Sequence, residues 1–512
     1  MKKFLLVLVT VFGVLSCSPS KKVAAWGDTG DGYYVNPVLV ADYSDPDVIR
    51  YGDKYYMVAS DFHFMGMQVL ESDDLVNWRI ISQIYDRLDL PGWETMEHYS
   101  GGSWAPSIRW HDGKFYVYFC TPDEGLFMSQ ADSPEGPWSP LHTVKAIARW
   151  EDPCPFWDED GNAYLGHSLK GAGPIIIHRM SPDGKELLDD GVTVYEGITA
   201  EGTKIHKWNG WYYLSIPEGG VRNGWQTVLR SKSIYGPYDR KVVLETGSTS
   251  VNGPHQGAIV DTPYGEWWFV HFQQLGALGR VVHLQPIHWE DGWPVMGEDY
   301  DGNGQGEPVS RWKKPVTAKK SIRRELPASS DKFNGTQLGL QWQFNHNPVD
   351  GAWSLTGDAL AIDALKADSF AHARNTLSQK LMGFKGSYTV CLDMSLFAEG
   401  QKAGLACMGK ENYCIGVRQG TAGRELYFEK DGEILATERI DASKLWLRLS
   451  FDAEDFKDSF AFSYSLGGRR FIPFGEAFTA QFGFWKGARP ALFSYNELAD
   501  GGTALFRDFR NE

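Results

Sequence analysis

A hairpin-like pattern recurs five times in the first 300 residues of the chain. Each copy has a short apolar run, a turn containing glycine and a second run rich in aromatic residues. The turn glycines are Gly52, Gly113, Gly161, Gly210 and Gly265, which lie 61, 48, 49 and 55 residues apart. Such a pattern indicates a β-hairpin. Hairpins repeated at this spacing are typical of a β-propeller, which has about four strands per blade. Five copies therefore predict five blades.

Acidic residues open several of these copies. The first strand of each copy is expected to begin at Asp45, Ala105, Asp152, Glu201 and His255. The innermost strands of a propeller line its central channel, so equivalent positions of successive blades converge there. A single acid of this kind is commonly only a turn residue. Three acids in one register of a repeat favour a functional site.

The amino-acid composition argues against some classes of binding partner. A chain of 512 residues can hold more than one domain, and 42% hydrophobic with 22% charged residues is typical of a folded protein. The net charge of −15 argues against nucleic acid, which needs a clustered basic face. The 20 Trp, 23 Tyr and 28 Phe residues suit strand packing, and also stacking on the apolar faces of sugar rings.

The N-terminal residues have the pattern of a targeting segment. Lys2 and Lys3 precede an apolar run over 4–15 that is too short for a stable membrane anchor. The run ends in Leu-Ser-Cys, which resembles the bacterial lipoprotein box. We predict a signal peptide over 1–16, lipid attachment at Cys17 and a flexible tether over 17–25. The alternative is an ordinary secretory peptide that contains a chance cysteine.

The predicted lipid anchor places the protein in the bacterial cell envelope, attached to the membrane. The tether has no acidic run, which favours the periplasmic face over the cell surface. The five remaining cysteines are an odd number without a CxxC motif, so neither a disulfide framework nor a zinc site is supported.

Changes in composition along the chain indicate two folded domains. The repeats predict a five-bladed β-propeller over 26–297. A Gly-rich acidic stretch and the basic run RWKKPVTAKKSIRRE follow, which indicate an inter-domain linker over 298–326. Beyond it, segments such as LWLRLSF alternate as half-buried strands do. The predicted fold is all-β, with the propeller followed by a β-sandwich over 327–512.

Three convergent acids suit the hydrolysis of a sugar bond. That reaction needs one carboxyl group that keeps its proton near neutral pH and another that is ionised. A third acid can set their pKa values by repulsion and hydrogen bonding. Phosphoryl transfer fits less well, because the sequence has no glycine-rich phosphate loop between a strand and a helix. A serine nucleophile elbow and an HExxH motif are also absent from the sequence.

Several motifs resemble glycoside hydrolase family 43. They are NPVLVADYSDPDVIRYGDKYYMVAS, GGSWAPSIRW, the Asp152 and Glu201 copies, GWQTVLRSKSIYGPY and GPHQG. The segment DKFNGTQLGLQWQFNHNP, at 331–348, resembles the start of the concanavalin-like sandwich found in β-xylosidase and α-L-arabinofuranosidase members. The resemblance covers nearly the whole chain after the targeting segment.

The resemblance implies roles for the three acids. Asp45 matches the general base that activates water, and Glu201 matches the general acid that protonates the leaving oxygen. Asp152 matches the acid that orients the proton donor and raises its pKa. The family's outcome is inversion, which needs room for a water between base and acid. Cys154 and the segment AEGTKI depart from the usual pattern and could reshape the pocket without removing a carboxylate.

Other positions are implied as substrate or metal contacts. His255 matches a channel histidine that faces a metal ion, commonly a structural calcium, through water; the alternative is a hydrogen-bonded core histidine. Arg280 matches an arginine that contacts substrate hydroxyls. Trp104 and Phe62 match aromatic walls of the terminal-sugar pocket, although each also suits channel packing. No cofactor is required for the chemistry.

The expected function is therefore an exo-acting hydrolase of plant cell-wall oligosaccharides or polysaccharides. We expect it to release terminal α-L-arabinofuranose from arabinoxylan or xyloglucan side chains. The alternative is a β-D-xylosidase acting on xylo-oligosaccharides, or a bifunctional enzyme. A noncatalytic glycan-binding lipoprotein is a further alternative, against which the intact set of three acids argues. The oligomeric state is left open.

Overall fold

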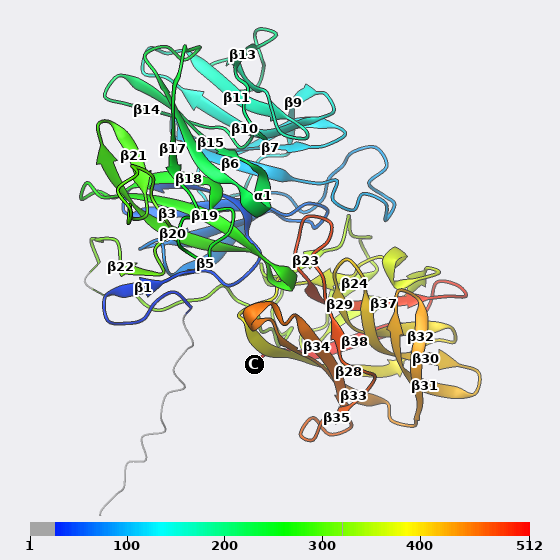
Figure 1. Ribbon diagram of the computed structural model, residues 1–512. Coiled ribbons are helices and arrows are strands. Elements are labelled where there is room, and N and C mark those ends of the chain that lie inside the picture. The colour runs from blue at the N-terminus through cyan, green and yellow to red at the C-terminus, as the bar shows by residue number, and fades with distance from the viewer. Residues whose placement is uncertain (1–25, 320) are drawn as a thin grey trace, which may run out of the picture.

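The computed structural model describes residues 26–319 and 321–512. The predicted signal peptide, lipid-attachment Cys17 and tether lie outside these residues. Within the described part of the chain, no helix is long and apolar enough to cross a membrane. The molecule consists of a propeller and a sandwich that lie side by side, blue to green and yellow to red in Figure 1.

Five four-stranded antiparallel sheets follow one another along the chain and confirm the predicted propeller. The first two blades are β2 (Ser44–Tyr51), β3 (Lys54–Ser60), β4 (Gln68–Ser72), β5 (Trp78–Gln83), and β6 (Trp104–His111), β7 (Lys114–Thr121), β8 (Gly125–Ala131), β9 (His142–Ala146). The third is β10 (Trp150–Trp157), β11 (Ala163–Leu169), β12 (Ile175–Met180), β13 (Val192–Tyr195). The last two are β14 (Lys204–Trp208), β15 (Trp211–Glu218), β16 (Trp225–Ser231), β17 (Asp239–Leu244), and β18 (His255–Asp261), β19 (Trp267–Leu275), β20 (Gly279–Glu290), β21 (Trp293–Met296).

Each repeated glycine lies in the turn between the first and second strands of its blade, as the pattern predicted. All five have positive φ, a conformation that glycine adopts at little cost. Short helical turns interrupt the strands at α1 (Gly220–Asn223), η1 (Gly276–Leu278), η2 (Phe370–His372) and η3 (Glu454–Phe456).

The second domain is a β-sandwich of two eight-stranded sheets, also as predicted. One sheet contains β23 (Gln343–Phe344), β26 (Leu365–Lys366), β27 (Leu377–Ser378), β29 (Gln401–Met408), β30 (Tyr413–Gly420), β31 (Gly423–Lys430), β32 (Glu433–Ile440) and β37 (Arg489–Asn496). The other contains β24 (Trp353–Leu355), β25 (Leu360–Asp363), β28 (Lys385–Leu396), β33 (Lys444–Asp452), β34 (Ser459–Ser465), β35 (Ile472–Pro473), β36 (Phe478–Thr479) and β38 (Thr503–Asn511). Leu445, Leu447 and Leu449 of β33 are fully buried, which confirms the alternation read from LWLRLSF.

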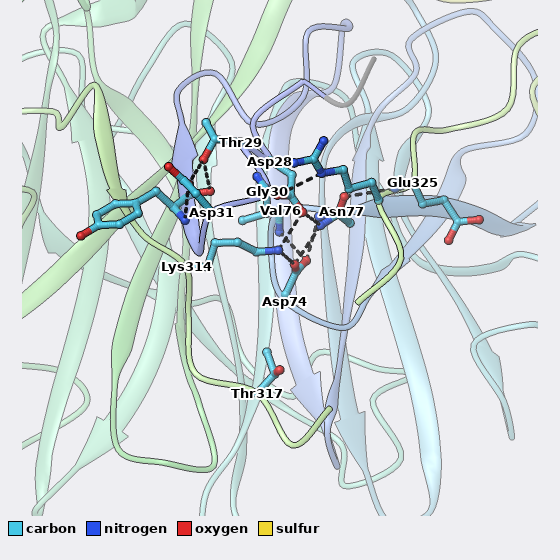
Figure 2. A network of polar contacts seen from close by, with 12 residues as sticks. Asp28, Thr29, Gly30, Asp31, Asp74, Val76, Asn77, Lys314, Thr317 and Glu325 are labelled. Carbon is cyan, nitrogen blue, oxygen red and sulfur yellow. Dashed lines mark hydrogen bonds and ion pairs between the residues drawn. The ribbon is translucent and has the colours of Figure 1, made fainter. Parts of the chain in front are cut away.

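The segment 298–326, expected as a linker, lies against the propeller. Its strand β22 (Arg311–Lys313) pairs with β1 (Tyr33–Val35). Figure 2 shows Lys314 between two buried carboxylates, with its Nζ 2.8 Å from Asp28 and 2.6 Å from Asp74. Asn77 donates to both of these acids, at 2.8 Å and 2.9 Å. Part of the basic run that marked a linker therefore neutralises buried acids of the propeller domain.

Candidate active site

The innermost strands of four blades are irregular at the same place. Pairing with the second strand shifts register at Asp45, Ala105, Asp152 and Gln256, and each of these residues has positive φ. Such β-bulges re-aim side chains and are common beside active sites. Proline follows the first three of these residues, which fits a bulge because proline cannot donate to a regular ladder. The bulges turn these positions toward one end of the channel.

Asp45 is held by three donors. Its Oδ2 accepts hydrogen bonds from the hydroxyls of Ser44 (2.9 Å) and Ser60 (2.6 Å). Its Oδ1 accepts from Arg280 Nη1 at 2.9 Å, and both members of this ion pair are buried. An ionised carboxylate has only acceptors to offer, so three converging donors suit that state.

Asp152 lies among other acids. It is buried, and its Oδ2 accepts a hydrogen bond from Gln256 Nε2 at 3.2 Å. Burial raises its pKa well above the usual range, and repulsion from Glu151 and Glu201 adds to this. The site thereby favours a protonated form of Asp152.

Glu201 precedes the innermost strand of its blade instead of opening it. The strand β14 begins three residues later, and the Glu201 amide donates to the Pro217 carbonyl at 3.2 Å. Burial raises the pKa of Glu201 to about 8, with repulsion from Glu151 and Asp45 acting in the same direction. Arg280 opposes this rise. Glu201 is therefore mostly protonated at neutral pH, the state that a general acid requires.

A fourth carboxyl group, Glu151, was missed by the sequence reasoning. It lies one residue before the third bulge and accepts hydrogen bonds from the amides of Gly171 (3.2 Å) and Ala172 (3.1 Å). Burial raises its pKa, although those amides act against the rise. The sequence reasoning assigned a role only to Asp152, which opens the copy, and not to the residue before it.

The fifth blade places Gln256, and not His255, at the position equivalent to Asp45 and Asp152. His255 lies one residue earlier and is fully buried. Both of its ring nitrogens lack a hydrogen-bond partner among the described residues, and burial lowers its pKa to about 4. Within the described residues, no three His, Cys, Asp or Glu side chains are arranged to hold a metal ion.

Arg280 and three aromatic side chains complete the walls. The rings of Phe62 and Trp104 meet edge to face at 6.3 Å, and Trp485 meets Trp104 in the same way at 6.3 Å. The guanidinium of Arg280 lies 5.9 Å from the Trp485 ring centre. Phe62 and Trp104 therefore lie together on one wall, and Trp485 joins them from the sandwich domain.

Buried polar contacts hold this sandwich loop in place. Asp42 of the propeller accepts hydrogen bonds from the amides of Arg280 (2.8 Å) and Gly487 (2.9 Å). A Cβ atom on Gly487 would lie 2.6 Å from the Gly279 nitrogen, so the two backbones approach too closely for a side chain. Asp42 thus links the arginine that contacts Asp45 to the loop that carries Trp485.

These groups surround one cavity of about 470 Å³. Its lining comprises Asp45, Phe62, Trp104, Ala105, Glu151, Asp152, Lys170, Gly171, Ala172, Thr199, Glu201, Gly220, Val221, Gln256, Arg280 and Trp485. His255 does not line it. A cavity of this size with aromatic walls and convergent acids has the features of a small-ligand site.

The sequence matches two family descriptions. Residues 34–294 match "Glycosyl hydrolases family 43". The chain belongs to this family. Residues 330–512 match "Beta xylosidase C-terminal Concanavalin A-like domain". The protein is therefore a glycosidase with a family 43 propeller and the sandwich that accompanies it in β-xylosidases.

Relatives of this family 43 protein carry two kinds of name. A putative beta-xylosidase of Xylanibacter ruminicola is 57% identical over 466 residues, which cover 91% of this chain and 86% of that one. A beta-xylosidase of Formosa agariphila is 35% identical, with 97% and 95% covered. A non-reducing end alpha-L-arabinofuranosidase of Bacteroides ovatus is 30% identical, with 63% of each chain covered.

A solved structure shares the two-domain architecture. It is a bifunctional GH43-CE protein of Bacteroides eggerthii, with a TM-score of 0.84 and 29% sequence identity. The match covers 93% of this chain and 63% of that one.

Proposed function

We propose that the protein is an exo-acting β-D-xylosidase that removes terminal xylose from xylo-oligosaccharides with inversion. The observation that carries the proposal is the contrast between two carboxyl groups in one cavity. Asp45 is surrounded by donors, whereas Glu201 is buried among acids that raise its pKa to about 8. Glycoside hydrolysis uses such a pair, one ionised and one protonated.

In this mechanism Asp45 accepts a proton from a water molecule that attacks the anomeric carbon. Glu201 donates its proton to the glycosidic oxygen as the bond to the leaving sugar breaks. Burial and the charges of Glu151 and Asp45 keep Glu201 protonated. Asp152 lines the same cavity as the acid that helps to place the proton donor, and Arg280 orients Asp45. The aromatic walls of Phe62, Trp104 and Trp485 bind the apolar faces of the sugar.

Xylose replaces arabinofuranose as the terminal sugar that we expect the enzyme to release. The relatives of Xylanibacter ruminicola and Formosa agariphila align over most of their length and are named beta-xylosidases, and the matched C-terminal domain carries that name as well. The arabinofuranosidase of Bacteroides ovatus is aligned over only 63% of this chain. These names support the xylosidase activity over the α-L-arabinofuranosidase activity expected from the sequence, and an additional activity on arabinofuranosides fits the same cavity.

NMR of the xylose first released from nitrophenyl β-D-xyloside tests the proposal, because this substrate yields one xylose only. Inversion at the β-linkage gives α-xylose before mutarotation, and β-xylose as the first product would contradict the mechanism. A comparison of nitrophenyl β-D-xyloside with nitrophenyl α-L-arabinofuranoside tests the sugar. A higher kcat/KM on the arabinofuranoside would overturn the choice of xylose.

We also propose that the protein is anchored in the cell envelope through a lipid on Cys17, with its folded domains on the periplasmic face. The sequence Leu-Ser-Cys after the apolar run supports this. Mass spectrometry of the mature N-terminus tests it, since an unmodified cysteine or a cleavage elsewhere would contradict it.

A calcium ion beside His255 is a separate proposal. Both buried ring nitrogens of His255 lack hydrogen-bond partners among the described residues, which fits a histidine that faces water molecules around an ion. Because no cluster of three ligating side chains occurs there within the described residues, water would supply most of the ligands. Elemental analysis of the purified protein tests it, and absence of calcium after dialysis against that ion would exclude the site.

A further inference from the structure

The central channel has a second cavity at its other end. The active site is lined by the beginnings of the innermost strands, whereas this cavity, here called the distal cavity, is lined by their ends. The lining includes 48–50 of β2, 109–111 of β6, 155–157 of β10, 205–208 of β14 and 259–261 of β18. All five blades therefore contribute to it. Its volume is about 500 Å³, within the range of small-ligand sites.

Tryptophan side chains from four blades line the distal cavity. They are Trp110, Trp157, Trp208 and Trp267. Trp110 remains 45% exposed, although a large aromatic side chain is ordinarily well covered in a folded domain. Its neighbour Tyr51, also 45% exposed, supports it with ring centres 5.2 Å apart. The wall thus presents an accessible aromatic surface supported from behind by other rings.

The charges on the wall are balanced in pairs. Arg50 donates two hydrogen bonds to Asp261, at 2.9 Å and 2.8 Å. Arg109 pairs with Asp47 at 2.6 Å, and Lys207 pairs with Asp158 at 2.5 Å. Burial lowers the pKa of His206 to about 3, so its ring is neutral at pH 7. Every charged side chain that lines the distal cavity therefore has a partner, which disfavours a charged ligand.

The Arg50–Asp261 pair still offers polar atoms to a ligand. Its two side chains are 29% and 35% exposed. A carboxylate has about four lone-pair sites, and Arg50 occupies only part of this capacity in Asp261. Neighbouring hydroxyl groups of a sugar match such a donor and acceptor pair. Aromatic faces combined with fixed polar groups and no net charge are the features that recognise a neutral carbohydrate.

We propose that the distal cavity is a second, noncatalytic binding site for a neutral xylan-type oligosaccharide. The sugar ring stacks on Trp110, and its hydroxyl groups bond to Arg50 and Asp261. The choice of a xylan-type ligand depends on the function proposed above, whereas the neutral carbohydrate class depends only on the cavity. Such a site would hold the enzyme on a polymer whose free ends the active site consumes.

Fluorine NMR of protein labelled with 5-fluorotryptophan can observe both cavities in one titration. Trp104 and Trp485 report the active site, and Trp110 reports the distal cavity. Each resonance is assigned by its loss in the corresponding Trp→Phe variant. The titration uses xylotriose and a Glu201→Gln background, so that the ligand is not hydrolysed. We expect two saturable sets of shifts, one at Trp104 and Trp485 and one at Trp110.

The outcomes separate this proposal from the proposed function. If Trp104 and Trp485 shift while Trp110 does not, the distal site is wrong and the active site stands. If Trp110 shifts while Trp104 and Trp485 do not, the distal site is supported and the assigned substrate is wrong. If the resonance of Trp446, which lies in the sandwich, shifted as much as that of Trp110 and neither saturated, the binding would be nonspecific and the distal site would be wrong.

Two variants sharpen the test. Trp110→Ala should raise the Kd of xylotriose at the distal cavity about tenfold, because it removes the stacking face. The fluorine resonance of Trp208 follows this binding. Tyr264→Ala is the matched control, since Tyr264 is 53% exposed in the turn between β18 and β19 but does not line the cavity. An equal loss in both variants, or no loss in Trp110→Ala, would contradict the assignment.

Discussion

Both ends of the innermost strands carry charged and aromatic side chains, but the two ends arrange the charges differently. At the active-site end, four strands are bulged and four carboxyl groups share the cavity with two cations, Arg280 and Lys170. At the distal end the strands pair regularly and each lining charge meets an opposite one. Burial raises the pKa values of Glu201 and Asp152, and the like charges that gather at the bulged end raise them further. Regular pairing at the other end leaves charges neutralised and aromatic faces free.

The sharpest contrast between the two ends is expected from glutamate substitutions. Glu201→Gln should lower kcat on xylobiose by roughly 10²- to 10⁴-fold, because the leaving oxygen loses its proton donor. The loss should be much smaller with a nitrophenyl leaving group, which needs little protonation. Steady-state kinetics on the two substrates measures this difference.

Glu159→Gln is the matched control for this substitution. Glu159 is exposed in the turn after β10, near the distal end of its blade, and lines neither cavity. Its replacement should leave kcat within about twofold, as is usual for a surface change. A loss below tenfold in Glu201→Gln on xylobiose would contradict the assignment of Glu201 as general acid.

A buried ion pair behind the distal cavity should contribute more to stability than an exposed pair does. Asp47 is 1% exposed and pairs with Arg109, so Arg109→Met should lower the free energy of unfolding by about 3 kcal/mol. The substitution leaves the buried carboxylate with the Ile108 amide and the more distant Lys204 as its remaining partners. Urea unfolding at pH 7, followed by tryptophan fluorescence, measures this.

An exposed pair provides the comparison. Lys114 and Asp132 are 40% and 84% exposed, so Lys114→Met should change stability by less than about 1 kcal/mol. Equal effects of the two substitutions would mean that Asp47 is not held by Arg109 in the way the contacts indicate.

The sequence predicted the scaffold well because its signals are local. Glycine turns followed by aromatic strands recur within each blade, and the alternation in LWLRLSF marked a strand of the sandwich. The acids Asp45 and Asp152 were predicted because each opens a copy of the repeat. A proline follows the bulged residue in three of the copies. An alignment of the copies on these prolines would have pointed to Glu151 as the residue before the third bulge.

Other parts of the site depend on contacts that local patterns do not encode. In the fifth blade no proline marks the bulge, and the equivalent position was assigned to His255 instead of Gln256. Trp485 lies 440 residues beyond Asp45 and reaches the cavity only because two domains pack together. Even the basic run 311–325, expected to be a solvated linker, includes Lys314, whose charge is used by two buried acids.

The domain contact should matter only for the active-site end. Gly487→Ala should lower kcat/KM on xylobiose about tenfold, because the added Cβ would lie 2.6 Å from the Gly279 nitrogen and displace the loop that carries Trp485. Gly467→Ala is the control, since its Cβ would meet nothing within 4 Å. Unchanged kcat/KM in Gly487→Ala would show that the sandwich loop does not position substrate.

The smallest expected effect tests whether repulsion between acids sets the pH profile. Glu201 works in its protonated form and has a pKa of about 8, so kcat/KM should fall as pH rises through about 8. The charge of Glu151 contributes to that raised pKa. Glu151→Gln removes the like charge, so the pKa of Glu201 should fall and the alkaline limb should move to lower pH. The Glu159→Gln control should keep the limb in place. If the limb of Glu151→Gln stayed in place or moved to higher pH, the charge of Glu151 would have no part in keeping Glu201 protonated.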